Sequence, residues 1–151
     1  MVDWSASSTP KTGKDSIWIA ELQGETGRTR FSNPSTRMEA FETLSGRLNR
    51  LRNDGKRVLL GFDFSLGYPT GTSKSLGLKG VPWKAMLRWL ANAIEDTPSN
   101  SNNRFDVASD MNKRISQTDL PFWGVTSHKH AGKYLSAKKP AELPNLSLIH
   151  I

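Results

Sequence analysis

One apolar segment in the middle of the chain, residues 58–66, carries a single charged side chain, Asp63. Its apolar residues are nearly continuous rather than alternating, a pattern typical of a central strand that is covered on both faces of a sheet. A bare carboxylate in such a strand costs free energy unless a cation, a basic partner or backbone donors compensate for its charge. The segment therefore predicts a buried strand with a functional carboxylate, although an Asp at a strand end also serves as a turn cap.

Three short strand candidates precede this segment. They cover residues 2–6, 16–22 and 28–32, with turn-rich sequence between them and glycines at positions 24 and 27. Adjacent short strands at this spacing predict an antiparallel meander.

A helix is expected between the meander and the apolar segment. We expect Asn33 to be its N-cap, Pro34 to occupy its first turn and residues 53–55 to end it. Its apolar face is expected to contain the residues that recur every three or four positions, namely Met38, Phe41, Leu44, Leu48 and Leu51. Further helices are predicted over residues 82–95 and 104–115, joined by a polar loop.

This order of elements predicts an α/β fold with a mixed sheet. Three antiparallel strands are expected first, followed by a parallel strand that returns through a helical crossover, with flanking helices. We expect this core to span residues 1–116, and residues 117–145 to be a basic, aromatic-containing loop or the start of a missing part. Residues 146–151 are similar to a non-native, adaptor-derived tail, and Asp3 lies close to the start, so the chain is expected to be a truncated fragment.

Composition limits the compartment and the partners. The chain has no cysteine, which excludes disulfides and thiolate metal sites and fits a reducing cytoplasm. No secretory leader is visible, and no apolar run approaches the roughly 20 residues that span a bilayer, so we expect a cytoplasmic protein without a membrane partner. The formal charge of +7 favours nucleic acid as a partner. Composition does not fix the oligomeric state.

A second acidic residue, Asp3, follows the apolar Val2 near the start of the chain. The first and fourth strands of the expected sheet would be neighbours, which would bring Asp3 close to Asp63. Two adjacent carboxylates repel each other unless a divalent cation lies between them, and hard oxygen ligands suit Mg²⁺ or Mn²⁺. Such a metal centre serves phosphodiester hydrolysis.

The order of these features resembles the layout of the ribonuclease H-like superfamily: an acid in strand one, a hairpin, a helix and an acid in strand four. The motifs Val2-Asp-Trp-Ser5 and Gly61-Phe-Asp-Phe-Ser-Leu-Gly-Tyr-Pro69 are most similar to an uncharacterised branch of predicted ribonuclease H-like nucleases. The resemblance covers about residues 1–95 and implies a metal-dependent nuclease, a hydrolase, with Asp3 and Asp63 as metal ligands. The segment Asn33–Ala40 is similar to the family's helix start and implies Glu39 as a third ligand.

Two site residues have competing interpretations. Glu39 lies away from the apolar stripe of its helix, so it also fits an ordinary first-turn Glu that the helix dipole favours. The resemblance implies a fourth acid on a late helix, for which Asp110 is the first choice and Asp106 the second. Both aspartates also fit solvated helix residues, and the missing C-terminal part is another place for the fourth acid.

Two other functions stay open. Actin-like and sugar-kinase-like proteins share the expected architecture and bind nucleotides for phosphotransfer, but the loop after Asp3 lacks their usual glycine. A non-catalytic module would bind nucleic acid or protein through a basic face, for which the later lysines are candidates: Lys129, Lys133, Lys138 and Lys139.

Overall fold

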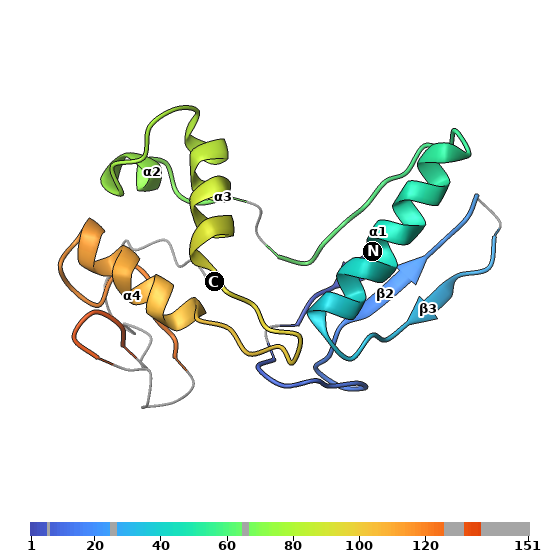
Figure 1. Ribbon diagram of the computed structural model, residues 1–151, viewed down its shortest axis with the longest axis horizontal. Helices are drawn as coiled ribbons and strands as arrows, with labels where there is room; N and C mark the ends of the chain where they lie inside the picture. The colour runs from blue at the N-terminus through green and yellow to red at the C-terminus, as the bar shows by residue number, and fades with distance from the viewer. Residues whose placement is uncertain (6, 25–26, 65–66, 126–131, 137–151) are drawn as a thin grey trace, which may run out of the picture. The chain divides into compact units, whose positions relative to one another are not determined.

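The computed structural model describes residues 1–5, 7–24, 27–64, 67–125 and 132–136 of the chain. These residues form a mixed α/β structure with three strands and four helices (Figure 1). The chain divides into two compact units, one made of residues 1–65 and 96–102 and the other of residues 66–95 and 103–151. The division into a core over residues 1–116, a loop over residues 117–145 and a tail over residues 146–151 stays a prediction.

The first unit contains the expected antiparallel meander. Strands β1 (Val2–Asp3), β2 (Trp18–Glu21) and β3 (Arg30–Ser32) pair in the order β1-β2-β3. Val2 lies opposite Ile19, and Ile19 lies opposite Ser32. Because side chains alternate along a strand, Ile17 and Ile19 point to one face and are buried, whereas Trp18 points to the other face. The prediction of three adjacent antiparallel strands is confirmed.

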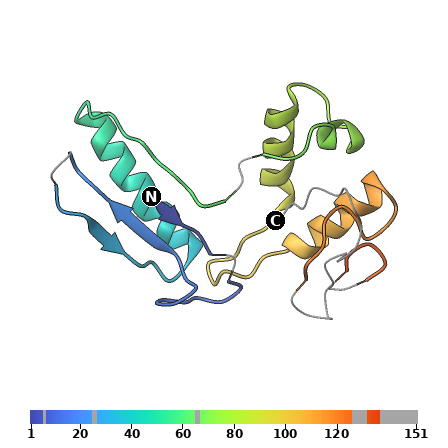
Figure 2. The same ribbon diagram turned by 180° about the vertical axis from the view of Figure 1, so that it is seen from behind.

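Helix α1 (Arg37–Asn53) covers the face of the sheet that carries these isoleucines (Figures 1 and 2). The core between them consists of Val2, Ile17, Ile19 and Ala40, with Trp4, Leu44 and Phe62 packed against it. Only part of the predicted apolar face is correct. Met38 and Phe41 are 45% and 67% exposed, whereas Ala40 is fully buried and belongs to the core with the sheet residues.

The predicted start of α1 is wrong by three residues. Thr36 is the N-cap, and its hydroxyl oxygen accepts a hydrogen bond from the Glu39 N–H at 3.1 Å. Asn33 binds other partners, since its side-chain oxygen accepts from the Gly13 N–H and its amide donates to the Ile17 carbonyl. The predicted end is confirmed, with Asp54 as C-cap and Gly55 at a φ of 66°.

The apolar segment 58–66 differs from its prediction. Residues 58–64 form no named strand, and the segment makes a single parallel bridge, between Val2 and Phe62. Phe62 packs against the core, but Leu59 is 97% exposed and Phe64 is 44% exposed. Among the residues that the structure describes, β1 is the only strand that bridges the segment, so the apolar residues 58–64 are not enclosed as those of a central strand would be.

A loop from later in the chain completes the first unit. The side chain of Arg37, 9% exposed, makes an ion pair with Asp96 in which Nε and Oδ2 are 2.6 Å apart. The same guanidinium donates to the carbonyls of Ser7 and Asn100, and the Asn100 side chain accepts from the Arg37 backbone N–H at 2.8 Å. Arg37 thus joins the start of α1 to the loop 96–102 and to the segment that follows β1.

The second unit is helical in its described part. It contains α2 (Thr72–Ser75), α3 (Pro82–Ala93) and α4 (Arg104–Ile115). Their core combines the buried residues Leu76, Met86, Val107, Ala108, Met111, Phe122, Val125 and Leu135. Asn112 is fully buried and bonds both backbone groups of Phe122, which holds residues 122–125 against α4. The predictions for α3 and α4 are confirmed to within two residues at their ends.

None of the helices in the described ranges is both long and apolar enough to cross a membrane.

Candidate metal centre

Asp3 and Asp63 lie on neighbouring stretches of backbone in the first unit. The bridge between Val2 and Phe62 is parallel, with the Val2 N–H donating to Gly61 O at 2.8 Å and the Asp63 N–H donating to Val2 O at 3.2 Å. Each aspartate therefore follows its bridged neighbour by one residue, on the same side of the bridge. The structure brings together the two acids that the sequence pairs.

One backbone donor orients the Asp63 carboxylate. The Trp4 N–H donates to Asp63 Oδ1 at 2.8 Å. Trp4 is itself fixed by edge-on ring contacts with Phe62 and Phe64, at centroid distances of 6.2 and 6.3 Å. The sequence did not predict this role of Trp4, because every residue except proline has a backbone N–H and the residue type does not show which one binds a carboxylate.

Asp63 affects the protonation of Asp3. A hydrogen bond with the Asp63 side chain raises the pKa of Asp3, and partial desolvation and the negative charge of Asp63 raise it further. Neither aspartate forms an ion pair with a residue in the described part of the chain. Apart from the Trp4 N–H, which donates to Asp63, no basic side chain there neutralises the two carboxylates, and such a pair can bind a cation.

The hydrogen bonds of Glu39 indicate a helix-capping role instead of metal binding. Its Oε2 atom accepts hydrogen bonds from the Ser35 N–H at 2.8 Å and from the Ser35 hydroxyl at 3.0 Å, while its own N–H is capped by Thr36. These contacts form a capping arrangement at the start of α1. The structure does not bring Glu39 together with Asp3 and Asp63 as a metal-ligand group.

The candidates for a fourth acid belong to the second unit. Asp110 lies on α4 and makes an ion pair with Arg114 one turn later, at 2.8 Å. Asp106 is exposed in the first turn of the same helix. Across the described ranges, no three side chains of the His, Cys, Asp or Glu types are grouped closely enough to hold one metal ion. Lys129, Lys138 and Lys139 lie outside the described residues.

The donor set fits a magnesium-type ion. Mg²⁺ keeps several of its waters and is held by one or two carboxylates, whereas a site that replaces all its waters needs more ligands. Asp3 and Asp63 supply two carboxylates at an exposed position, where water can complete the coordination shell.

The raised pKa of Asp3 has a measurable consequence for stability without metal. Asp3 has a higher pKa in the folded state than in the unfolded state, so protonation of Asp3 stabilises the folded state. This stabilisation is complete below the pKa that Asp3 has in the unfolded state, and it is lost as the pH rises through its pKa in the folded state. At pH 7 in EDTA the carboxylates repel each other. Asp3→Asn should therefore raise Tm at pH 7, with the gain shrinking toward pH 4. Thermal unfolding at several pH values measures it, and a lower Tm for the variant at pH 7 would contradict it.

No protein-family model, curated protein or solved structure matches this chain.

Proposed function

We propose that this chain is a metal-dependent nuclease with a ribonuclease H-like arrangement, in which Asp3 and Asp63 hold Mg²⁺ or Mn²⁺. The observation that carries the proposal is the pairing of the two carboxylates across the parallel bridge, with the pKa of Asp3 raised by Asp63. The antiparallel order β1-β2-β3, followed by α1 and a segment that bridges β1 in parallel, supports the same arrangement. We also propose that the sheet is a mixed one with a helical crossover before its parallel strand, and that it is truncated in this chain.

The residues of the chain would have separate tasks. Asp3 and Asp63 hold the cation, and the Trp4 N–H keeps one Asp63 oxygen in place. When bound, the cation supplies a water nucleophile of lowered pKa and neutralises charge on the departing oxygen of a phosphodiester. Asp110 and Asp106 remain candidates for a further ligand. Glu39 remains a candidate only if its carboxylate releases its hydrogen bond with the Ser35 N–H.

The test joins metal binding to cleavage. The chain is titrated with MgCl₂ or MnCl₂, with Tm as the readout, and then incubated with labelled RNA, DNA and RNA–DNA hybrid in the same buffers and in EDTA. A saturating divalent cation should raise Tm by about 2–5 °C, since it binds the folded state selectively. Cleavage should need the cation and stop in EDTA.

Other results would favour another function. No Tm shift with either cation and no cleavage of any substrate would overturn the proposal. A Tm shift with ATP alone would favour nucleotide binding of the actin or sugar-kinase type. Salt-sensitive nucleic-acid binding that survives loss of both aspartates would favour a non-catalytic module.

A further inference from the structure

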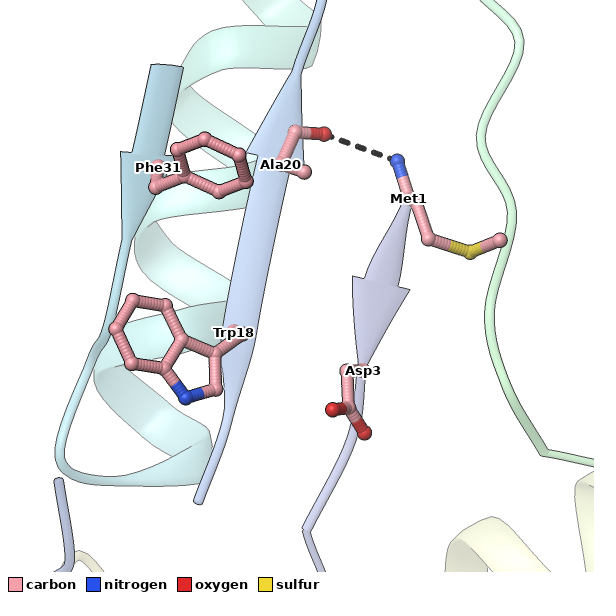
Figure 3. A pocket seen from close by; sticks show the side chains of 5 residues that line it. All are labelled: Met1, Asp3, Trp18, Ala20 and Phe31. Atoms are coloured by element: carbon pink, nitrogen blue, oxygen red, sulfur yellow. Dashed lines mark hydrogen bonds between the residues drawn. The ribbon is translucent and has the colours of Figure 1, made fainter. Parts of the chain in front are cut away.

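One edge of the sheet in the first unit is open along the apolar segment. Figure 3 shows β1, which carries Met1 and Asp3, between β2 on one side and the pale green trace of residues 58–64 on the other. Within the described part of the chain, the backbone hydrogen bonds of this segment are the two with Val2 of β1. Its other side therefore has N–H and C=O groups that a further strand can pair with.

The free backbone groups recur at every second residue. The Gly61 carbonyl and the Asp63 N–H point to β1, and the chain makes no turn between residues 56 and 61. Because these directions alternate from one residue to the next, the N–H and C=O of the even-numbered residues point to the open side. These residues are Val58, Leu60 and Phe62.

The open edge lacks the features that discourage pairing between strands. Neither a charged residue nor a proline lies between Arg57 and Asp63, and Leu59 is 97% exposed. At the opposite edge, β3 is only three residues long and includes the charged Arg30. Short length and charged side chains keep a strand edge unpaired. The segment next to β1 is therefore the edge that suits another strand.

The segment is complementary to itself in the antiparallel direction. When two copies pair about a twofold axis at Leu60, the two Leu60 residues lie opposite each other and exchange both of their hydrogen bonds. Val58 of each copy then faces Phe62 of the other and does the same. One residue further out, Arg57 of each copy faces Asp63 of the other.

Other twofold registers fit less well. An axis at Leu59 or at Gly61 also keeps the free backbone groups opposite one another, but it brings no opposite charges together. The axis at Leu60 also places the exposed Leu59 of each copy against Gly61 of the other, where the absence of a side chain leaves room for it. Charge and size therefore favour the same register.

The charges that this register brings together lack partners in the described ranges. Arg57 and Asp63 are both exposed, and neither has an ion pair there. Alternation along the segment places Arg57 on the face of Asp63, which is also the face of Asp3. Since directly opposed side chains have Cβ atoms about 5 Å apart, the guanidinium of the second copy reaches the Asp63 oxygen that the Trp4 N–H leaves free.

We infer that a second copy of this chain pairs antiparallel with residues 57–63 and places its Arg57 beside the carboxylates of Asp3 and Asp63. Twofold pairing uses the open edge of both copies and closes on itself, so the product is a dimer and not a fibre. The inference goes beyond the proposed function and does not depend on it. Its tests are made in EDTA, where no divalent cation occupies Asp63.

A single engineered cysteine tests the register, because the chain has none of its own. Leu60→Cys places two thiols opposite each other, with Cα atoms about 5.5 Å apart, which a disulfide can span. Val58→Cys is the matched control: Val58 is 46% exposed against 37% for Leu60, but its two copies would lie about 14 Å apart along the strands. Mild oxidation should link Leu60→Cys into a covalent dimer and leave Val58→Cys monomeric on a denaturing gel. Equal linking of the two variants, or linking of neither, would overturn the inference.

An exchange of charges tests the partner. Sedimentation of the unmodified chain should show a dimer whose fraction rises with concentration. Arg57→Asp and Asp63→Arg should each weaken this dimer by about tenfold or more, because each variant brings like charges opposite one another. An equimolar mixture of the two should dimerise again, since every opposed pair is then Asp with Arg. Arg28→Asp removes an exposed charge outside the open edge and should dimerise as the unmodified chain does.

Circular dichroism shows whether each variant is folded. If Asp63→Arg fails to fold, the weaker dimer of Arg57→Asp and the disulfide of Leu60→Cys still decide the question. An unmodified chain that sediments as a monomer at every concentration would overturn the inference. A dimer that tolerates Arg57→Asp would also overturn it, since the two copies would then meet through another surface.

Discussion

Asp63→Asn should lower metal-dependent cleavage by about a thousandfold while leaving the fold intact. The amide oxygen of Asn can still accept the Trp4 N–H, so the local backbone keeps its hydrogen bond. What the variant loses is one negative charge at the proposed cation site. Asp3→Asn should have a similar effect, and the double variant should be little worse than either one, because two ligands of one ion act as a unit.

The measurement combines kinetics with a check of folding. Initial rates of cleavage are compared in MgCl₂ and in MnCl₂, and circular dichroism and Tm are recorded for each variant. The metal-induced rise in Tm should disappear together with activity. Glu42→Gln provides a matched control, since Glu42 is exposed on α1. Full cleavage by both Asp3→Asn and Asp63→Asn would refute the assignment, whatever the substrate.

Glu39→Gln distinguishes the two interpretations of that residue. Gln can still accept from the Ser35 N–H, so a capping role predicts cleavage within about twofold of the unmodified chain and a stability loss of at most about 1 kcal/mol. A ligand role predicts a loss of cleavage comparable to that of Asp63→Asn.

Local patterns predicted the elements whose determinants are close together in the sequence. Helix α3 begins at Pro82, where the missing N–H is harmless, and α4 spans the predicted residues 104–115. Strand β2 lies within the predicted range 16–22, and the alternation of Ile17, Trp18 and Ile19 gives it one buried and one open face. The juxtaposition of Asp3 and Asp63 could be expected because the first and fourth strands of the predicted sheet would be neighbours.

Features that depend on distant partners could not be predicted in this way. The start of α1 moved because Asn33 bonds Gly13 and Ile17 instead of capping the helix. The continuous apolar run around Leu59 suggested burial, but burial depends on what packs against both sides of the segment, and this is not encoded within the segment. Glu39 has the residue type and position of a ligand, yet the neighbouring Ser35 and Thr36 give it a capping partner.

Arg37 is the clearest case of a residue whose role only the fold reveals. Its ion-pair partner, Asp96, is 59 positions away in the sequence. The guanidinium makes two hydrogen bonds of 2.6 Å with that carboxylate and donates at 2.8 Å to the Ser7 carbonyl, in the segment that follows Asp3. Bidentate pairing of this kind needs the planar fork of Arg, which Lys does not have.

Arg37→Met should therefore destabilise the first unit by about 2–4 kcal/mol. The lower part of that range reflects Asp96, which is 37% exposed and can be rehydrated after the loss of its partner. Lys11→Met is the matched control, because its pair with Asp15 is exposed at 44% and 72% and should contribute less than about 1 kcal/mol. Denaturant unfolding followed by circular dichroism measures both variants.

The same substitution tests whether the loop 96–102 depends on this ion pair. Hydrogen exchange should show faster exchange at the Asn100 N–H, which donates to the Thr97 carbonyl at 3.0 Å within the loop. Protection in α4 should change little, since α4 belongs to the other unit and has its own core. Arg37→Lys should recover only part of the stability, because one ammonium cannot replace a fork that binds Asp96, Ser7 and Asn100 together. If Arg37→Met costs no more than Lys11→Met, the loop is held by other contacts and Arg37 is dispensable.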